Sequence, residues 1–186
     1  MNIGIDIDDT ITNTYETLIP IITMKYGMRF DKLLKQNPSY SMLHNVLPDF
    51  KSFVLDNYTT MAKMVPLKTG VVDVLNKLKE DGHKIIFISA RNNIEYNNPY
   101  DISLNYLKAN NIPFDKLIVN VKDKAKECIL QDIDLFIDDN TKNCKAVKSK
   151  GIETLQFGTI FTPRNKHLKR VNTWEEVYSQ VQEMFA

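Results

Sequence analysis

The sequence has few cysteines, no long apolar run and no strong charge of either sign. Its only cysteines are Cys128 and Cys144, and neither has a nearby His or Cys at a metal-ligand spacing. Two such thiols predict reduced, buried side chains rather than a zinc site or a disulfide. No stretch approaches the roughly 20 apolar residues that a membrane span needs. The N-terminus shows no basic region followed by an apolar signal core, so we expect a cytoplasmic protein that binds no membrane.

The charge balance argues against one class of partner. Lys plus Arg number 24 and Asp plus Glu number 23, which leaves a net charge of +1. A binder of nucleic-acid polymers would normally be strongly basic, whereas a small phosphorylated metabolite needs only local positive charge. The length of 186 residues fits one domain, or one domain with a small inserted cap. No feature of the sequence indicates the oligomeric state.

Five short apolar runs predict β-strands. They cover residues 3–7, 85–88, 117–119, 135–137 and 152–157. The middle three are nearly continuous, which is typical of strands that are covered on both faces in a parallel sheet. Because helical patterns lie between the runs, we predict an α/β fold, a three-layer sandwich of helices around a parallel β-sheet.

Several predicted helices have recognisable ends. The helical patterns lie at residues 71–78, 102–107, 123–131, 140–149 and 174–185. The first has Thr69 as a candidate N-cap and Gly82 as a candidate terminator. In the last, Thr173 and Glu176 form a capping box, and Trp174 repeats with other apolar residues at helical spacing, which predicts core packing.

The chain between Ile7 and Lys84 is longer than a single crossover helix requires. We therefore predict a small helical cap, residues 13–65, inserted after the first strand. Residues 1–12 and 66–186 would form the α/β core. Pro20 should kink the first helix of the insertion or shift its start.

Polar residues close several of the predicted strands. Ligands of open parallel α/β sheets bind outside the carboxyl ends of the strands, so these residues form the candidate site. The first run closes with Asp6, Asp8 and Asp9, the second with Ser89, Ala90 and Arg91, and the fourth with Asp138 and Asp139, while Lys124 stands at the start of the helix before the fourth. Acidic, hydroxyl and basic groups should therefore meet at one edge of the sheet.

Up to five carboxylates would gather at this edge. Two like charges about 4 Å apart repel by about 4 kcal/mol at an effective dielectric constant of about 20, so the cluster needs a cation. All the available ligands are oxygens, with no His or Cys close in sequence, which favours Mg²⁺ over Zn²⁺. A Mg²⁺ ion with open coordination positions would also hold a phosphate oxygen in these acidic surroundings.

Each side chain then has a candidate role in phosphoryl transfer. Asp6 can attack phosphorus and form an aspartyl-phosphate. Asp8 cannot face the same way on a regular strand, but at a strand end it can turn toward the leaving oxygen and act first as general acid, then as general base. Ser89 can hydrogen-bond a phosphoryl oxygen, and Lys124 can neutralise the nucleophile and the transferring group. Arg91 could bind a substrate phosphate or close an ion pair.

These residues resemble the four motifs of the haloacid dehalogenase (HAD) superfamily of phosphohydrolases. The matching segments are residues 3–10, residues 85–89, Lys124 and residues 135–139, so that the resemblance spans almost the whole chain. It implies a Rossmann-like parallel sheet with a small helical cap, and Mg²⁺ as the cofactor. It also implies Asp6 as nucleophile and Asp8 as acid/base. The Asp8 main-chain carbonyl and either Asp138 or Asp139 would join Asp6 as metal ligands.

Two further points stay open at this stage. Lys122, Lys124 and Lys126 all lie near the expected helix start, and the family pattern favours Lys124, with Asp123 as a possible cap. The cap could also supply a base-stacking surface from its aromatic residues, which are Tyr26, Phe30, Tyr40, Phe50, Phe53 and Tyr58.

Within the superfamily, the short chain, the acidic pair and the segment 89–91 resemble the 5′(3′)-deoxyribonucleotidases and bacterial nucleotidases. This implies a nucleoside monophosphate as substrate. Deoxyribonucleotidases usually carry Gly-Val after the second Asp, where this chain has Asp9 and Thr10. A phosphatase of a sugar phosphate or another small metabolite is therefore the alternative. A phospho-receiver-like signalling domain is less consistent, because the third run closes with Asn120 and not with an Asp.

Overall fold

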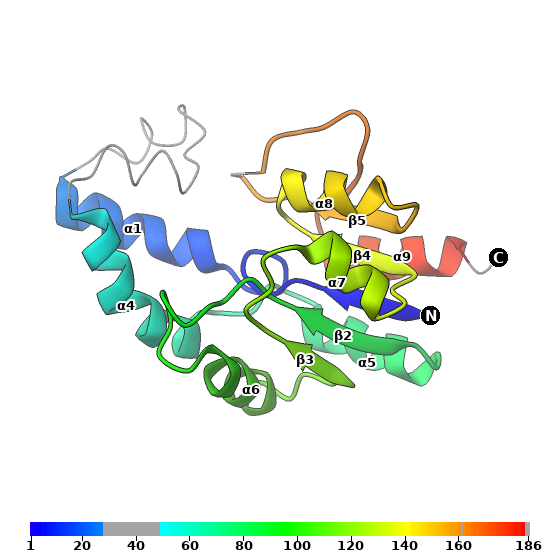
Figure 1. Ribbon diagram of the computed structural model, residues 1–186, viewed down its shortest axis with the longest axis horizontal. Helices are drawn as coiled ribbons and strands as arrows, with labels where there is room; N and C mark the ends of the chain where they lie inside the picture. The colour runs from blue at the N-terminus through cyan, green and yellow to red at the C-terminus, as the bar shows by residue number, and fades with distance from the viewer. Residues whose placement is uncertain (28–48, 161, 185–186) are drawn as a thin grey trace.

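The computed structural model describes residues 1–27, 49–160 and 162–184, with the backbone but not the side chains of residues 50, 51 and 53–56. Within these residues a six-stranded parallel sheet forms the centre of the molecule (Figure 1). The strands are β1 (Asn2–Ile5), β2 (Lys84–Ile88), β3 (Lys116–Ile118), β4 (Leu135–Asp138), β5 (Glu153–Phe157) and β6 (Lys169–Val171). Their order is β3-β2-β1-β4-β5-β6, and all neighbouring strands are parallel. The predicted α/β sandwich is thus confirmed.

The apolar runs in the sequence predicted five of these strands correctly but did not predict β6. This strand has only three residues, of which Lys169 is exposed and Arg170 half-buried, so that Val171 alone enters the core. At the edge of a sheet a strand does not need a continuous apolar run. For this reason hydrophobic patterning gave no signal for β6.

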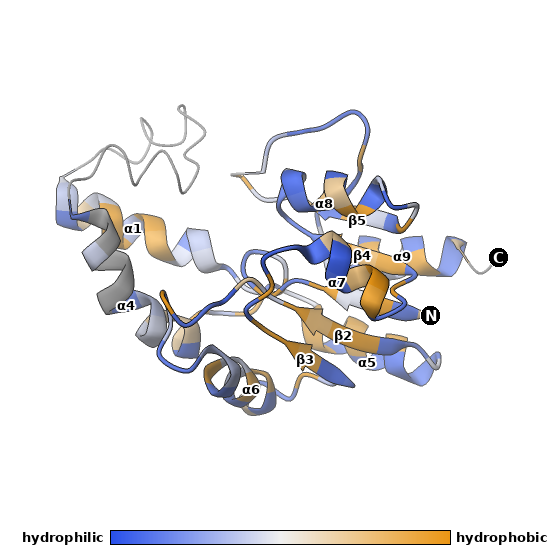
Figure 2. Ribbon diagram, viewed as in Figure 1, coloured by the Kyte–Doolittle hydropathy of each residue, from blue (hydrophilic) through white to orange (hydrophobic). Residues whose placement is uncertain are grey.

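Helices cover both faces of the sheet. The core helices are α5 (Val71–Glu80), α6 (Pro99–Ala109), α7 (Lys124–Leu130), α8 (Thr141–Lys148) and α9 (Trp174–Glu183). Ile3 and Ile5 of β1 pack in one core with apolar residues of α5 and α9, whereas Phe136 of β4 packs in a second core with residues of α7 and α8. Figure 2 accordingly shows hydrophobic strands between helices that are hydrophilic on the outside.

The close approach of β1 and β4 explains one glycine. A Cβ atom on Gly4 would lie 3.1 Å from Cδ2 of Phe136 and 3.2 Å from Cγ2 of Ile133. Such contacts are tighter than most real Cβ contacts, so a larger residue here would force Phe136 to move. Glycine at this position therefore allows Phe136 and Ile133 of the second core to pack directly against β1, the strand that leads into Asp6.

The helix ends differ from the predictions in two details. The N-cap of α5 is Gly70, with φ of 80°, and not Thr69. In α9 the Thr173 hydroxyl accepts a hydrogen bond from the Glu176 amide at 3.1 Å, as the capping box requires. The Glu176 carboxylate, however, accepts from the Asn172 amide at 2.7 Å, one residue before the expected partner. Only the Thr173 half of the predicted box is therefore formed.

The segment between β1 and α5 contains two described helices. These are α1 (Thr14–Tyr26) and α4 (Phe50–Met64), which lie beside the sheet beyond its carboxyl edge (Figure 1). An antiparallel bridge between Thr12 and Leu67 joins the two ends of this segment. Helix α1 begins at Thr14 and runs through Pro20, so the proline does not shift its start. No helix among the described residues is both long and apolar enough to span a bilayer.

Candidate active site

The side chains predicted from strand ends surround one cavity of about 230 Å³. They are Asp6, Asp8, Ser89, Ala90, Arg91, Lys124, Asp138 and Asp139, and all of them line it. The reason is topological. The strands β1, β2 and β4 are adjacent and parallel, so their carboxyl ends lie side by side. The structure brings these residues together, and their individual roles remain predictions at this point.

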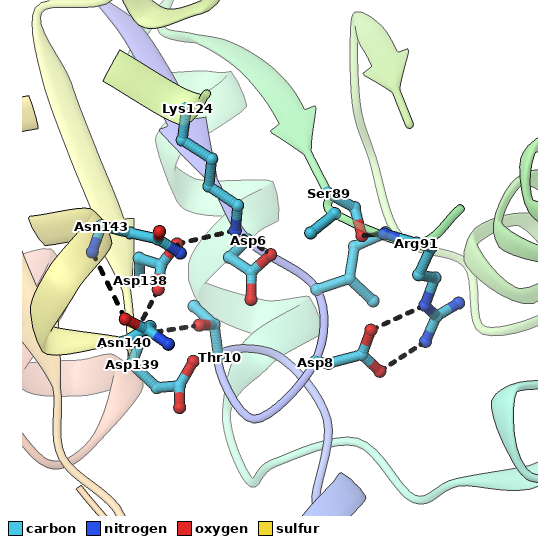
Figure 3. A network of polar contacts seen from close by, with 12 residues as sticks. Asp6, Asp8, Thr10, Ser89, Arg91, Lys124, Asp138, Asp139, Asn140 and Asn143 are labelled. Carbon is cyan, nitrogen blue, oxygen red and sulfur yellow. Dashed lines mark hydrogen bonds and ion pairs between the residues drawn. The ribbon is translucent and has the colours of Figure 1, made fainter. Parts of the chain in front are cut away.

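Lys124 lies between two carboxylates (Figure 3). Its Nζ donates to Asp6 Oδ1 and, at 2.7 Å, to Asp138 Oδ2. The Lys124 side chain is only 4% exposed. Burial alone would lower the pKa of its ammonium, but the carboxylates of Asp138 and Asp6 hold that pKa above the ordinary value. Lys124 is therefore a permanently charged group in contact with the predicted nucleophile.

The other two lysines near this helix start do not enter the site. Lys122 and Lys126 are both exposed, whereas Lys124 is buried at the first position of α7. The helix is capped by Asp123, whose side chain accepts a hydrogen bond from the Lys126 amide at 3.0 Å. The cap thus directs Lys124, and not its neighbours, toward the sheet.

Three carboxylates form a cluster that one cation could hold. Oxygens of Asp6, Asp138 and Asp139 all lie within 4.8 Å of one another. Burial raises the pKa of Asp6 to about 7, against the attraction of Lys124. Burial, together with the charge of Asp138, also raises the pKa of Asp139 well above its ordinary value. Among the described residues, the three carboxylates share one contacting ammonium, so the charge of Lys124 does not balance the cluster.

Asp138 and Asp139 have different surroundings. The fully buried Asp138 accepts hydrogen bonds from Lys124 Nζ at 2.7 Å, from the Asn140 amide at 2.7 Å and from Asn143 Nδ2 at 3.1 Å. The Asp139 amide donates to Thr10 Oγ1 at 3.1 Å. Among the described residues, no side chain or amide donates to the Asp139 carboxylate at hydrogen-bond distance. Asp139 therefore keeps oxygens free for a ligand.

The Asp8 carboxylate lies apart from this cluster and is held by Arg91. Arg91 Nε and Nη2 donate to its two oxygens, each at 2.8 Å (Figure 3). Thr14 Oγ1 donates to Asp8 Oδ1 at 3.0 Å. Burial alone would raise the pKa of Asp8, but the Arg91 guanidinium and its hydrogen bonds hold that pKa below the ordinary value. Of the two alternatives considered for Arg91, the structure shows the ion pair.

Asp9 shapes the turn that presents Asp6 and Asp8. Its backbone has φ of 59°, a left-handed conformation that Asp and Asn tolerate better than other non-glycine residues. Its Oδ1 accepts a hydrogen bond from the Tyr15 amide at 2.9 Å, at the start of α1. Asp9 therefore links the loop that follows β1 to the first helix of the insertion.

Ser89 and Ala90 follow β2 directly. Ser89 is buried, and its Oγ accepts a hydrogen bond from the Arg91 amide at 3.2 Å, which leaves the hydroxyl proton available for another acceptor. Ala90 is exposed in the cavity wall. Both line the same cavity as the acidic cluster, as expected for residues that would contact a phosphoryl group.

Several cavity and support residues were not predicted. Thr14, Tyr15, Tyr96 and Asn143 line the cavity, and they come from helix starts and a loop where single residues have no periodic signal. Trp174, predicted to be structural only, is fully buried but also donates its indole N–H to the Thr10 carbonyl at 3.2 Å. It thereby holds the backbone of the loop that follows β1.

Two of the six aromatic residues predicted as a stacking surface, Tyr26 and Tyr58, have described side chains. Tyr58 lines the cavity, and Tyr26 is not among the lining residues. Phe30 and Tyr40 lie outside the described residues, as do the side chains of Phe50 and Phe53. The two cysteines are buried, as predicted, and both thiols are free.

Solved structures share the fold. A HAD-type hydrolase from Bacillus subtilis, whose crystal structure holds magnesium, superposes with a TM-score of 0.62 over 97% of each chain at 12% identity. At this identity the similarity shows the fold alone. Together with the family match and the relatives described next, this fold defines the chain as a HAD-type phosphohydrolase, an enzyme that hydrolyses phosphate monoesters.

The chain belongs to the family described as 5′ nucleotidase, deoxy (pyrimidine), cytosolic type C protein (NT5C), whose model matches residues 1–185. A protein named nucleotidase from Clostridium acetobutylicum is 27% identical over 191 residues, which cover 100% of this chain and 95% of that protein. A candidate 5′(3′)-deoxyribonucleotidase from Chlorobaculum tepidum is 24% identical over 96% of this chain and 89% of that protein. Asp9 and Thr10 in place of Gly-Val are therefore compatible with this nucleotidase family.

Proposed function

We propose that the protein hydrolyses nucleoside monophosphates in a Mg²⁺-dependent reaction that passes through an aspartyl-phosphate on Asp6. The observation that carries the proposal is the placement of Asp6. It directly follows the central strand β1, lines a cavity, contacts the ammonium of Lys124 and shares a carboxylate cluster with Asp138 and Asp139. A nucleophilic carboxylate needs such a cationic environment to stay ionised and to approach a phosphate dianion.

The donor set fits Mg²⁺. The cluster offers only carboxylate oxygens, and among the described residues its three carboxylates are in contact with a single ammonium, that of Lys124. We propose that the Asp6 and Asp139 carboxylates and the Asp8 main-chain carbonyl hold the ion. When bound, Mg²⁺ would supply the charge that offsets the cluster and the transferring phosphoryl group. Magnesium in the Bacillus subtilis structure supports this choice.

Asp139→Asn is expected to raise the Mg²⁺ concentration needed for half-maximal phosphate release by at least about tenfold, because it removes a charged ligand whose carboxylate accepts no hydrogen bond from the described residues. The measurement is the initial rate of phosphate release as a function of Mg²⁺, for the variant and the wild type. At saturating Mg²⁺ much of the activity should return. Asn143→Ala is the control, since it removes a donor to Asp138 and should leave the Mg²⁺ requirement nearly unchanged. An unchanged Mg²⁺ dependence in Asp139→Asn would contradict the ligand assignment.

The remaining residues complete the proposed reaction. A carboxylate oxygen of Asp6 attacks phosphorus, and the ester bond breaks while Asp8 gives a proton to the departing alcohol. Water then attacks the aspartyl-phosphate and gives a proton to Asp8, which releases phosphate and restores Asp6. Ser89 donates its hydroxyl proton to a phosphoryl oxygen, next to the backbone of Ala90. Lys124 stabilises the negative charge on the nucleophile and on the phosphoryl group throughout.

Aromatic residues in the wall of the cavity support a nucleoside as the leaving group. Tyr15, Tyr58 and Tyr96 line the cavity together with the phosphate-site residues. Aromatic rings provide stacking surfaces for a base, and the family and the named relatives point to nucleotides. We propose that residues 13–65, which supply Tyr15 and Tyr58, act as the cap over this cavity. A phosphatase of a sugar phosphate or another small metabolite remains the second candidate, because the cavity itself is polar and acidic.

The test is phosphate release from a substrate panel by the purified protein in Mg²⁺. The panel holds nucleoside and deoxynucleoside 5′- and 3′-monophosphates, sugar phosphates and p-nitrophenyl phosphate. We expect the highest kcat/KM for a nucleoside monophosphate and loss of all activity with excess chelator. Preference for sugar phosphates would contradict the substrate assignment, and activity that persists under chelation would contradict the metal dependence.

A further inference from the structure

Arg91 makes a set of contacts that no substrate-binding role requires. Its Nε and Nη2 donate to the two oxygens of Asp8, each at 2.8 Å, and its Nη1 donates to Ser103 Oγ in α6 at 3.2 Å. The planar guanidinium matches a carboxylate through two parallel hydrogen bonds. All three guanidinium nitrogens are therefore engaged with oxygens of the protein itself.

The guanidinium is also fixed by packing. Arg91 is 2% exposed, and its Cζ lies 5.4 Å from the centroid of the Tyr96 ring. That ring stacks on Tyr58 of α4, with centroids 5.3 Å apart and an interplanar angle of 10°. At the backbone, the Arg91 carbonyl accepts a hydrogen bond from the Asn120 amide at 2.8 Å. Arg91 thus has little freedom to turn toward a ligand in the cavity.

Asp8, by contrast, needs external support. It follows the end of β1 in a turn, and its side chain is 29% exposed. Its carboxylate is held by three hydrogen bonds, two from Arg91 and one from Thr14 Oγ1 at 3.0 Å. A group that transfers a proton must be kept within hydrogen-bond reach of the reacting oxygen, and a displacement of about 1 Å can cost about 100-fold in rate.

We propose that Arg91 is a positioning residue that holds the Asp8 carboxylate in place for proton transfer, and that it does not bind the substrate phosphate. Ser103 and Tyr96 fix the guanidinium, and Tyr58 connects this support to helix α4. The inference rests on the proposed acid/base role of Asp8 and adds to it the group that makes the role possible.

The test compares two substrates that differ in their need for a proton. An alcohol leaving from a nucleoside 5′-monophosphate needs an acid, whereas the acidic phenol leaving from p-nitrophenyl phosphate hardly does. In Arg91→Lys, which keeps the charge but loses the paired hydrogen bonds, we expect kcat/KM to fall by about 100-fold for the nucleotide and by less than about fivefold for the aryl phosphate. The ratio kcat/KM reports only the first phosphoryl transfer, so later steps do not obscure the comparison.

Two other variants complete the design. Thr14→Val removes the third hydrogen bond to Asp8 with little change in shape and should show the same substrate dependence, with a loss of about tenfold for the nucleotide. Arg170→Lys is the matched control, because Arg170 donates to the carbonyls of Thr159 and Thr162 and not to the site. It should leave both substrates unaffected.

The outcomes separate the possible roles of Arg91. An equal loss on both substrates would overturn the inference, because partial unfolding lowers the active fraction for every substrate alike. A rise in KM for both substrates at unchanged kcat would also overturn it and would show that Arg91 binds the phosphate. If the wild type released no phosphate from either substrate, the proposed function itself would be wrong. That result differs from the two outcomes above, in which the wild type is active and only the role of Arg91 is wrong.

Discussion

Asp6→Asn is expected to lower kcat/KM for phosphate release by more than about 1,000-fold. The amide has the size of the carboxylate and can still accept a hydrogen bond from Lys124, so the site should keep its shape. It lacks the nucleophilic oxygen that forms an aspartyl-phosphate. Removing one charge from the crowded carboxylate cluster should also leave the folded state at least as stable as the wild type.

Mass spectrometry after rapid acid quenching provides the second measurement on this variant. The wild-type protein should gain one phosphoryl group during turnover, on the peptide that contains Asp6, and the variant should gain none. Asp9→Asn is the matched control. It removes a buried carboxylate three positions away, while Asn tolerates the left-handed backbone and can still accept from the Tyr15 amide. The control should keep its activity within about tenfold of the wild type. Full activity in Asp6→Asn, or phosphate found on another residue, would falsify the proposed mechanism.

The sequence predicted where the site lies because strand ends in a parallel sheet leave a local signal. An apolar run followed by Asp, Ser or Asp-Asp locates both the strand and its carboxyl end, and adjacent parallel strands then bring these residues together. The same reasoning could not distinguish Asp138 from Asp139, since both fit a strand end. The distinction comes from hydrogen bonds made by Asn143 and Lys124, which depend on how α7 and α8 pack.

Other parts of the site have no periodic signal at all. The pairing of Arg91 with Asp8 joins residues 83 positions apart, and its supports Tyr96 and Ser103 lie in a loop and on a helix of ordinary composition. The sequence could suggest an ion pair for Arg91 but could not name its partner. Helix patterning likewise indicated an insertion without showing which of its aromatic residues would reach the cavity.

Lys124→Met is expected to lower both stability and activity. The ammonium is the only described cation in contact with both Asp6 and Asp138, and Asp138 is fully buried. Removing one partner of a buried ion pair typically costs about 3–5 kcal/mol, because the remaining charge loses its compensation. For a chain of this size that corresponds to a fall of roughly 6–20 °C in Tm. The loss of charge beside the phosphoryl group should lower kcat by at least about 100-fold.

The two effects of this substitution can be separated with Mg²⁺ and with a neighbouring lysine. Thermal unfolding in chelator measures the destabilisation, and Mg²⁺ should restore part of the lost Tm, because a cation held by Asp6 and Asp139 offsets the same carboxylates. It should not restore kcat, since the ion does not replace the ammonium that donates a hydrogen bond to Asp6. Lys126→Met removes an exposed lysine from the same helix and should change stability by less than about 0.5 kcal/mol and activity hardly at all. If both variants behaved alike, Lys124 would be no more than a solvated residue of α7, and the charge balance proposed for the whole cluster would have to rest on the metal alone.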